Sequence, residues 1–210
     1  MKKQMIYIIF FLCFLVLLRV FLFEIYFINQ NSMNNTYKTG NRVLILKNYY
    51  SIKRNDVLIF QNDNENMIKR CLGLPGETIK IQNGKIYSDN SLVTNPSTAV
   101  LENSSDMDVF SMSEIFHTYG EKWDLNNFGN YLIPAKGMKI LLTPKNLSLY
   151  SKINKEDNFN KMPNPKNSYY IFNNNYFFLI GDNRPQSVDS RFYGPIKESQ
   201  IKGKVIFDIF

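Results

Sequence analysis

Lys69 has surroundings that could turn a lysine into a base. It lies in the segment NMIKRCL, and in an extended strand it shares one face with Met67 and Cys71 while Arg70 points to the other. Apolar neighbours remove water from a lysine ammonium, so its pKa falls below the ordinary value of about 10.4. Such a lysine can be neutral at working pH and accept a proton. A surface strand with two solvated basic residues is the other interpretation, because most lysines in proteins are exposed.

A second cluster with chemical potential follows an apolar run near the C-terminus. The segment GDNRPQSVDSRFYG surrounds Ser187 and Ser190 with the opposite charges of Asp182, Arg184, Asp189 and Arg191. Opposed charges at this density predict an ion-pair network that holds the loop in one shape. The Ser187 hydroxyl could then hold a neutral lysine in position by hydrogen bonding, as an activated nucleophile requires of its base.

Ser32 is a nucleophile that such a base could serve. It lies in the polar segment NQNSMNNTYKTGN, just past a block of hydrophobic residues. The only histidine of the chain is His117, so a Ser-His-Asp arrangement would depend on that one residue. Lysine is the other established base, and Ser-Lys pairs recur among proteases. Ser32 with Lys69 is therefore the economical pairing.

The N-terminal block predicts a membrane anchor. Met5 to Phe23 is apolar except for Arg19, and as a helix this stretch spans about 28 Å, close to the hydrocarbon thickness of a bilayer. Lys2 and Lys3 precede it, and the positive-inside rule places that end in the cytoplasm and the rest of the chain outside. A cleaved signal peptide is the alternative, but bulky and aromatic residues follow where a small-x-small cleavage site would be.

The remainder of the chain reads mainly as β-structure. Short aliphatic and β-branched runs predict strands at Asn41–Lys47, at Asp56–Gln61, within Asn66–Ser88, and in the runs NYFFLIG and KGKVIFDIF. Asn83-Gly84, between TIKIQ and KIYS, predicts a hairpin. Between these strands lies a region rich in Asn, Ser, Lys and Asp, roughly Asn90–Asn175, which we interpret as an inserted subdomain with a short helix in DVFSMSEIFHTYG.

Composition narrows the choice of partners. The chain of 210 residues is 44% apolar and carries a net charge of +7, but its lysines are scattered rather than gathered in a stripe. Attraction to anionic lipid accounts for the charge as well as nucleic acid does, so charge alone does not decide between them. With the predicted anchor, we expect a lipid membrane and no nucleic acid as partner. Cys13 and Cys71 lie in different environments, which disfavours a disulfide, and two Cys with one His do not supply an ordinary zinc site.

Taken in chain order, these segments resemble those of bacterial type I signal peptidases, the membrane-anchored serine proteases that release exported proteins. The resemblance covers the anchor, NSMNNTYKTGNRVLIL, KRNDVLIF, IKRCLGLPGETIKI and GDNRPQSVDSRFYGPI, of which the last two are the most specific. It implies that Ser32 is the nucleophile, Lys69 the general base and Ser187 the hydroxyl that orients Lys69. The structural charges of such a site would be Asp182, Arg184, Asp189 and Arg191.

The resemblance also implies an architecture and a location. The expected fold is an antiparallel β-sheet catalytic domain with an inserted smaller subdomain, preceded by one transmembrane helix, and it uses neither metal nor cofactor. The expected divisions are residues 1–27 for the cytoplasmic start and anchor, 28–89 and 176–210 for the catalytic domain, and 90–175 for the insertion. The catalytic domain would lie outside the bacterial plasma membrane, where it would cut the signal peptides of exported preproteins.

The resemblance also implies pockets for the substrate. By the same resemblance, small side chains before the cut would fit shallow pockets lined by Ile28, Met33, Met67, Ile68 and Val188, although core packing is an equally common fate of such residues.

Three positions near the nucleophile depart from the family pattern. The family usually has Pro at the position of Asn29, a small hydroxyl residue at that of Gln30, and Pro at that of Asn35. The Gln30 amide could replace the hydroxyl as an oxyanion donor. These departures leave open a protease with one dedicated substrate, and a catalytically weak or inactive relative that acts as a binding module.

Overall fold

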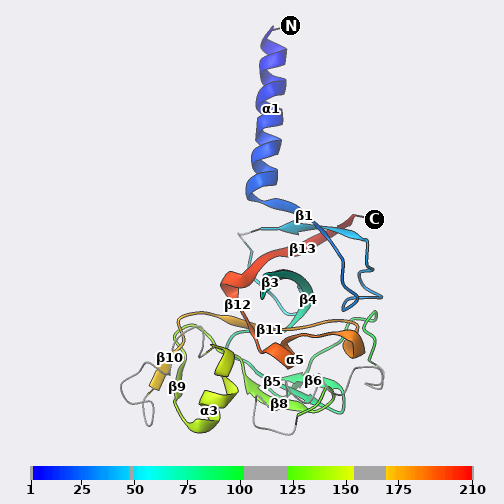
Figure 1. Cartoon of the computed structure of the whole chain (residues 1–210). Coiled ribbons are helices and arrows are strands. Elements are labelled where there is room, and N and C mark those ends of the chain that lie inside the picture. The colour runs from blue at the N-terminus through cyan, green and yellow to red at the C-terminus, as the bar shows by residue number, and fades with distance from the viewer. Residues whose placement is uncertain (1, 48–49, 102–122, 154–168, 210) are drawn as a thin grey trace.

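A long apolar helix leads out of a body made of β-strands (Figure 1). The computed structural model describes residues 2–47, 50–101, 123–153 and 169–209. Helix α1 (Lys2–Phe21) is long and apolar enough to cross a membrane, and none of its apolar window is buried against the body. It ends two residues before the expected Phe23, because the chain turns at Leu22 and enters strand β1 (Phe23–Phe27).

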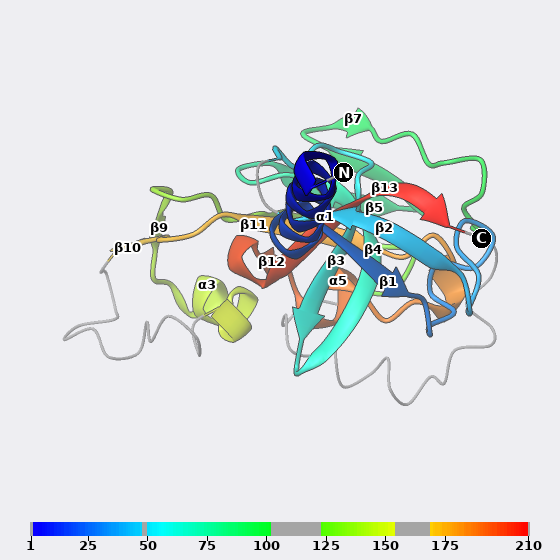
Figure 2. The same cartoon turned by 90° about the horizontal axis from the view of Figure 1, so that it is seen from above.

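The larger sheet has seven strands in the order β1-β2-β13-β3-β4-β11-β12, and every pairing within it is antiparallel. Its members after β1 are β2 (Arg42–Leu46), β3 (Val57–Asn62), β4 (Glu65–Gly73), β11 (Tyr176–Ile180), β12 (Ile196–Lys197) and β13 (Ile201–Ile209). The strands expected from the aliphatic runs are thus confirmed. Figure 2, which looks down α1, shows β1 running out from the base of the helix. The residues that were expected to end the anchor therefore form an edge strand of this sheet.

A second sheet lies at the end of the body away from α1 (Figure 1). It has the order β7-β6-β5-β8, formed by β5 (Thr78–Gln82), β6 (Lys85–Ser88), β7 (Ser91–Leu92) and β8 (Phe128–Leu132). The hairpin expected at Asn83-Gly84 is confirmed between β5 and β6, and both residues have the positive φ that such a turn requires. The boundary expected between the catalytic domain and the insertion, at residues 89 and 90, lies between β6 and β7 of this sheet.

The region interpreted as an insertion contributes further small elements. Strands β9 (Lys139–Leu141) and β10 (Tyr169–Ile171) pair with each other, and helix α3 (Pro144–Leu149) follows β9. The chain from residue 181 onward adds the short helix α5 (Ser190–Tyr193) and the one-turn 3-10 helices η3 (Arg184–Gln186) and η4 (Glu198–Gln200). The helix expected in DVFSMSEIFHTYG, with His117, lies outside the described residues.

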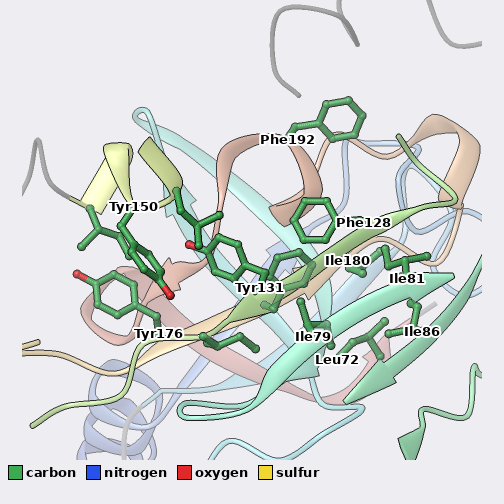
Figure 3. Packing of buried hydrophobic residues seen from close by; sticks show 14 of the residues in the cluster. Leu72, Ile79, Ile81, Ile86, Phe128, Tyr131, Tyr150, Tyr176, Ile180 and Phe192 are labelled. Carbon is green, nitrogen blue, oxygen red and sulfur yellow. The ribbon is translucent and has the colours of Figure 1, made fainter. Parts of the chain in front are cut away.

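Three hydrophobic clusters hold these layers together. The largest joins the second, four-stranded sheet to α3, β10, β11 and α5, and in it Phe128 and Tyr131 both contact Phe178. Figure 3 shows Phe128 and Tyr131 within this cluster. A second cluster lies under the loop between β1 and β2, and a third lies between β3, β4, β11 and β12. Strand β4 contributes Ile68 to the second cluster and Cys71 to the third, so it runs between them.

Candidate active site

Ser32 and Lys69 meet where the loop after β1 reaches strand β4. Lys69 Nζ lies 2.6 Å from Ser32 Oγ, and the side chains are 1% and 6% exposed. The residues are brought together from sequence positions 37 apart. The pairing expected from residue types alone is therefore present as a direct hydrogen bond between two buried side chains.

The backbone around Ser32 is a closed loop. Ile28 N–H donates to the Asn41 carbonyl at 3.0 Å, which closes the loop at its base. Past the serine, the N–H of Tyr37 donates to the carbonyl of Met33 at 2.8 Å, and the Met33 side chain is fully buried beneath this turn. A closed turn over a buried side chain gives the Ser32 hydroxyl one position relative to β4.

Burial sets the charge state of Lys69. Loss of solvent around the ammonium lowers the pKa of Lys69 to about 8; the Asp189 carboxylate opposes this change and the Arg191 guanidinium adds to it. A pKa of about 8 leaves roughly a tenth of the lysine neutral at pH 7 and half of it neutral near pH 8. Met67 packs against the third cluster and Cys71 belongs to it, so the neighbours of Lys69 on its own strand face are apolar, as expected.

Asp189 anchors the loop that follows β11. Its carboxylate is fully buried and accepts from Arg191 Nε at 2.8 Å and Nη2 at 2.9 Å, from Ser187 Oγ at 2.7 Å and from Gly181 N–H at 3.1 Å. Burial alone would raise the pKa of Asp189, but the charge and hydrogen bonds of Arg191 outweigh it and hold that pKa below its ordinary value. The proton of the Ser187 hydroxyl is thus directed to Asp189, and its lone pairs remain for another donor.

Asp182 makes the second ion pair of the site. It accepts from Arg70 Nε at 2.8 Å and Nη2 at 2.6 Å, and from the Thr36 hydroxyl at 2.6 Å. Arg70 follows Lys69 on β4 and Thr36 follows Ser32 in its loop, so one carboxylate ties together both segments that carry the proposed dyad. Arg184, the remaining charge of the expected network, donates to the Gly181 carbonyl at 2.9 Å and to Asn95 Oδ1 at 2.8 Å. Its burial, with Arg191 nearby, lowers the pKa of Arg184 to about 10.

Gly181 allows these parts to approach one another. A Cβ placed on Gly181 would collide with the Ser187 hydroxyl and would lie 2.5 Å from the Ser32 carbonyl oxygen. Only hydrogen fits at this point, because no real Cβ contact is so short. The loop after β11 therefore packs directly on the backbone of Ser32.

The five residues expected to line substrate pockets divide into two groups. Ile28, Met33 and Ile68 are buried in the second hydrophobic cluster, and Met67 packs against the third. Val188 is 47% exposed. Within the described part of the chain, no three His, Cys, Asp or Glu side chains come together to hold a metal ion.

A family model described as signal peptidase, peptidase S26, matches residues 1–210. The chain belongs to the signal peptidase family. Signal peptidase I V of Bacillus subtilis (strain 168) is 30% identical over 178 residues, which are 83% of this chain and 78% of that protein. Signal peptidase I of Bacillus caldolyticus is 29% identical over 199 residues, 93% of this chain and 84% of that protein. A crystal structure of a signal peptidase I from Enterococcus faecalis V583 matches 76% of this chain and 100% of its own, with 17% identity and a TM-score of 0.41.

Two departures of this signal peptidase from the expected family pattern have structural explanations. Asn35, where the pattern has proline, has a φ of 78°, a left-handed conformation that asparagine tolerates and proline cannot adopt. The Gln30 side chain donates through Nε2 to the carbonyl of Asn66 at 3.3 Å, at the start of β4. One of its two amide hydrogens is therefore engaged with β4, and through it Gln30 links the loop to that strand.

Sequence reasoning missed several residues of this signal peptidase site. Arg70 was assigned only to the strand face opposite Lys69, yet it is the partner of Asp182. Its position next to Lys69 was the available signal, because a buried carboxylate in a loop requires a buried cation to pair with it. Thr36 and Asn183, which also contact the site, carried no signal beyond their place in the motifs.

Proposed function

We propose that this signal peptidase cuts signal peptides from exported preproteins with Ser32 as nucleophile and Lys69 as general base. The observation that carries the proposal is the 2.6 Å hydrogen bond between Lys69 Nζ and Ser32 Oγ. A serine is a weak nucleophile until a base takes its proton, and a buried lysine with a pKa of about 8 is such a base. Membership of the family, whose members are serine endopeptidases, supports the same assignment.

The chemistry follows from the positions of the two groups. The neutral amine of Lys69 accepts the Ser32 proton as Oγ attacks the scissile carbonyl, and the carbonyl oxygen takes on negative charge. When the tetrahedral intermediate breaks down, the Lys69 ammonium returns that proton to the leaving amine. In deacylation Lys69 takes a proton from water as the water oxygen attacks the acyl-enzyme ester. The Lys69 ammonium then returns this proton to Ser32 Oγ as the ester C–O bond breaks and the product carboxylate leaves. The backbone N–H of Ser32 would stabilise the oxyanion.

Ser187 is proposed to orient Lys69 in this cycle. Its hydroxyl is fully buried, and its proton is held by Asp189 at 2.7 Å. That bond fixes the oxygen, so its lone pairs would offer the Lys69 amine an acceptor in one position; in the described part of the chain Lys69 Nζ is hydrogen-bonded to Ser32 and not to Ser187. Asp189 is fixed in turn by the two-point bond from Arg191. The charge network thus supports the base and does not take part in proton transfer.

The membrane side of the molecule is proposed from the outer face of the large sheet. The register aligns Ile25 of β1 with Leu44 of β2 and Phe207 of β13 in one row, and the next row on this face joins Phe27 and Ile209 on either side of Arg42. Ile25, Phe27 and Phe207 are 42%, 57% and 65% exposed. An exposed apolar face next to the end of a membrane-spanning helix is well suited to contact lipid.

The joint between α1 and the sheet supports this orientation. Lys47 donates through Nζ to the carbonyl of Val20 at 2.8 Å, near the C-terminal end of α1, where a cation satisfies an unpaired carbonyl. The backbone N–H of Lys47 also donates to the carbonyl of Leu22, at 2.7 Å. With Lys2 and Lys3 on the cytoplasmic side, the body would lie on the outer surface of the plasma membrane.

Cleavage of a model preprotein in detergent tests the proposal. The unmodified protein should cut after a small residue, and Ser32→Ala and Lys69→Ala should each reduce the rate to background. Undiminished cleavage by Ser32→Ala would exclude the mechanism. If the unmodified protein cuts only one preprotein of a panel, it is a protease with a dedicated substrate. If it cuts none and no serine-reactive inhibitor labels Ser32, it is a binding module.

A further inference from the structure

Asn183 lies between two charges of the network and contacts the backbone on both sides of Ser32. Its Nδ2 donates to the carbonyl of Asn31 at 3.0 Å, and its backbone N–H donates to the carbonyl of Ser32 at 3.0 Å. The residue is only 7% exposed. Asn183 therefore binds two carbonyls, one on each side of the Ser32 Cα: its side chain binds that of Asn31 and its backbone binds that of Ser32.

The bond to Asn31 sets the direction of the Ser32 N–H. The Asn31 carbonyl and the Ser32 N–H belong to one peptide unit, which is planar and trans, so the two groups point in opposite directions. A donor that fixes the carbonyl therefore fixes the N–H as well. The same carbonyl accepts from the Asn34 N–H at 3.0 Å, so two donors hold the orientation of this peptide plane.

That N–H is available for a substrate. Among the described residues, the Ser32 N–H donates to no protein acceptor, whereas both carbonyls beside it are bonded. The Gln30 amide, the other expected oxyanion donor, donates to the Asn66 carbonyl. One hydrogen of that amide is thus occupied, and the Ser32 N–H is the donor beside the nucleophile whose direction the loop sets.

Asn183 is itself held on each side. The Val100 N–H donates to the Asp182 carbonyl at 2.9 Å, and the Arg184 N–H donates to the Val100 carbonyl at 3.2 Å. The second hydrogen of Asn183 Nδ2 reaches Gln186 Oε1 at 3.0 Å. Both hydrogens of the amide are therefore used, and the side chain has one rotamer that satisfies them.

We propose that Asn183 is a positioning residue that aims the Ser32 N–H at the oxyanion of the tetrahedral intermediate. The inference rests on the proposed role of Ser32 as nucleophile. It gives the asparagine of the GDNR segment a task that the ion-pair network does not perform, because Asn183 carries no charge and its side-chain amide donates to the Asn31 carbonyl and to Gln186.

The test compares Asn183→Ala with the matched control Asn95→Ala. The control removes a hydrogen bond of similar length to the same loop, from Arg184 Nη2 to Asn95 Oδ1, and touches neither carbonyl beside Ser32. For Asn183→Ala we expect kcat on a peptide substrate to fall about 10- to 100-fold, less than the 10²–10³-fold cost of deleting an oxyanion donor. KM should change less than about 3-fold, and the pH midpoint of kcat/KM should stay that of the unmodified protein.

Inhibitor binding distinguishes a misdirected Ser32 N–H from general damage to the active site. A peptide aldehyde forms a hemiacetal with Ser32 Oγ whose oxygen occupies the oxyanion position, whereas the cleaved product peptide binds without one. Asn183→Ala should weaken the aldehyde by the same factor as kcat and leave the affinity for the product peptide unchanged. Asn183→Asp has the same shape but places an acceptor against the Asn31 carbonyl, so we expect the same pattern from it. It provides the test if the alanine variant does not fold.

The outcomes distinguish the two proposals. If Ser32→Ala abolishes cleavage but both Asn183 variants match Asn95→Ala, the positioning role is wrong and the dyad stands. Equal weakening of the aldehyde and the product peptide, or a rise in KM with kcat unchanged, would also overturn it. If Ser32→Ala still cleaves, the dyad proposal fails and the positioning role fails with it.

Discussion

Arg70 and Asp182, which lie 112 residues apart in the sequence, form a two-point ion pair with bonds of 2.8 and 2.6 Å. Each partner is next to a residue proposed to act in catalysis or in positioning: Arg70 follows Lys69 on β4, and Asp182 precedes Asn183. Because successive strand residues point to opposite sides, Arg70 can bind the loop from one face of β4 while Lys69 reaches Ser32 from the other. The pair therefore fixes the distance between the two halves of the site.

Removal of one partner should destabilise the fold strongly. Asp182→Asn leaves the Arg70 guanidinium buried without a counter-charge, and breaking a buried pair in this way costs about 3–5 kcal/mol. Equilibrium denaturation in detergent measures the free energy of unfolding. The matched control is Glu24→Gln, which breaks the exposed 3.6 Å pair with Lys47 and should cost less than about 1 kcal/mol. Similar costs for the two variants would show that the Arg70–Asp182 pair contributes no more than a surface contact.

Activity should rise with pH through the pKa of Lys69. The base must be neutral, and burial lowers the pKa of Lys69 to about 8, so kcat/KM should increase about tenfold per pH unit below 8 and level off above it. Rate measurements on a peptide substrate between pH 6 and 10 check the profile. A midpoint below pH 6.5, or a rate that does not change with pH, would indicate that another group is the base.

The same pKa has a consequence for stability with a definite sign. The pKa of Lys69 is lower in the folded chain than its ordinary value of 10.5, so between pH 8 and 10.5 the unfolded chain binds a proton that the folded chain does not. Stability from this group therefore increases with pH across that window. A Lys69→Met variant should lack this increase in denaturation experiments at pH 8 and pH 10, and equal slopes for the two proteins would contradict the assignment.

The strands and the dyad could be predicted from sequence because their signals are local. Aliphatic runs and the Asn83-Gly84 turn are complete within a few residues. Strand alternation and the single histidine made Lys69 a candidate base, and the family resemblance of its segment selected it over a solvated surface lysine. The partnership of Arg70 with Asp182 depends on how β4 pairs with β11, which no short segment records. Phe23–Phe27 was assigned to the anchor because an edge strand with exposed aromatic side chains has the same composition as the end of a membrane helix.

The stability of variants at Asn35 should depend on how well each residue adopts its left-handed backbone conformation. Its φ of 78° suits glycine and asparagine, costs alanine about 1 kcal/mol or more, and is closed to proline. Free energies of unfolding should therefore fall in the order glycine, alanine, proline, with Asn35→Gly close to the unmodified protein. Asn35→Pro, which restores the residue of the family pattern, should also lose cleavage activity because it deforms the turn that presents Ser32. An active and stable Asn35→Pro would show that the left-handed conformation is not required.

Gly181→Ala should damage the site more than the fold. The added methyl collides with the Ser187 hydroxyl and the Ser32 carbonyl oxygen, so both must shift. Overpacking of this kind costs about 1–3 kcal/mol in stability, whereas a displacement of the nucleophile by about 1 Å can cost 10²-fold in rate. The matched control is Gly137→Ala, where φ is 82° but a Cβ meets no atom within 4 Å. It should lose stability through backbone strain and keep its cleavage rate. The free energy of unfolding and kcat are to be measured for both variants. A fully active Gly181→Ala would show that the loop after β11 does not pack tightly on the Ser32 backbone.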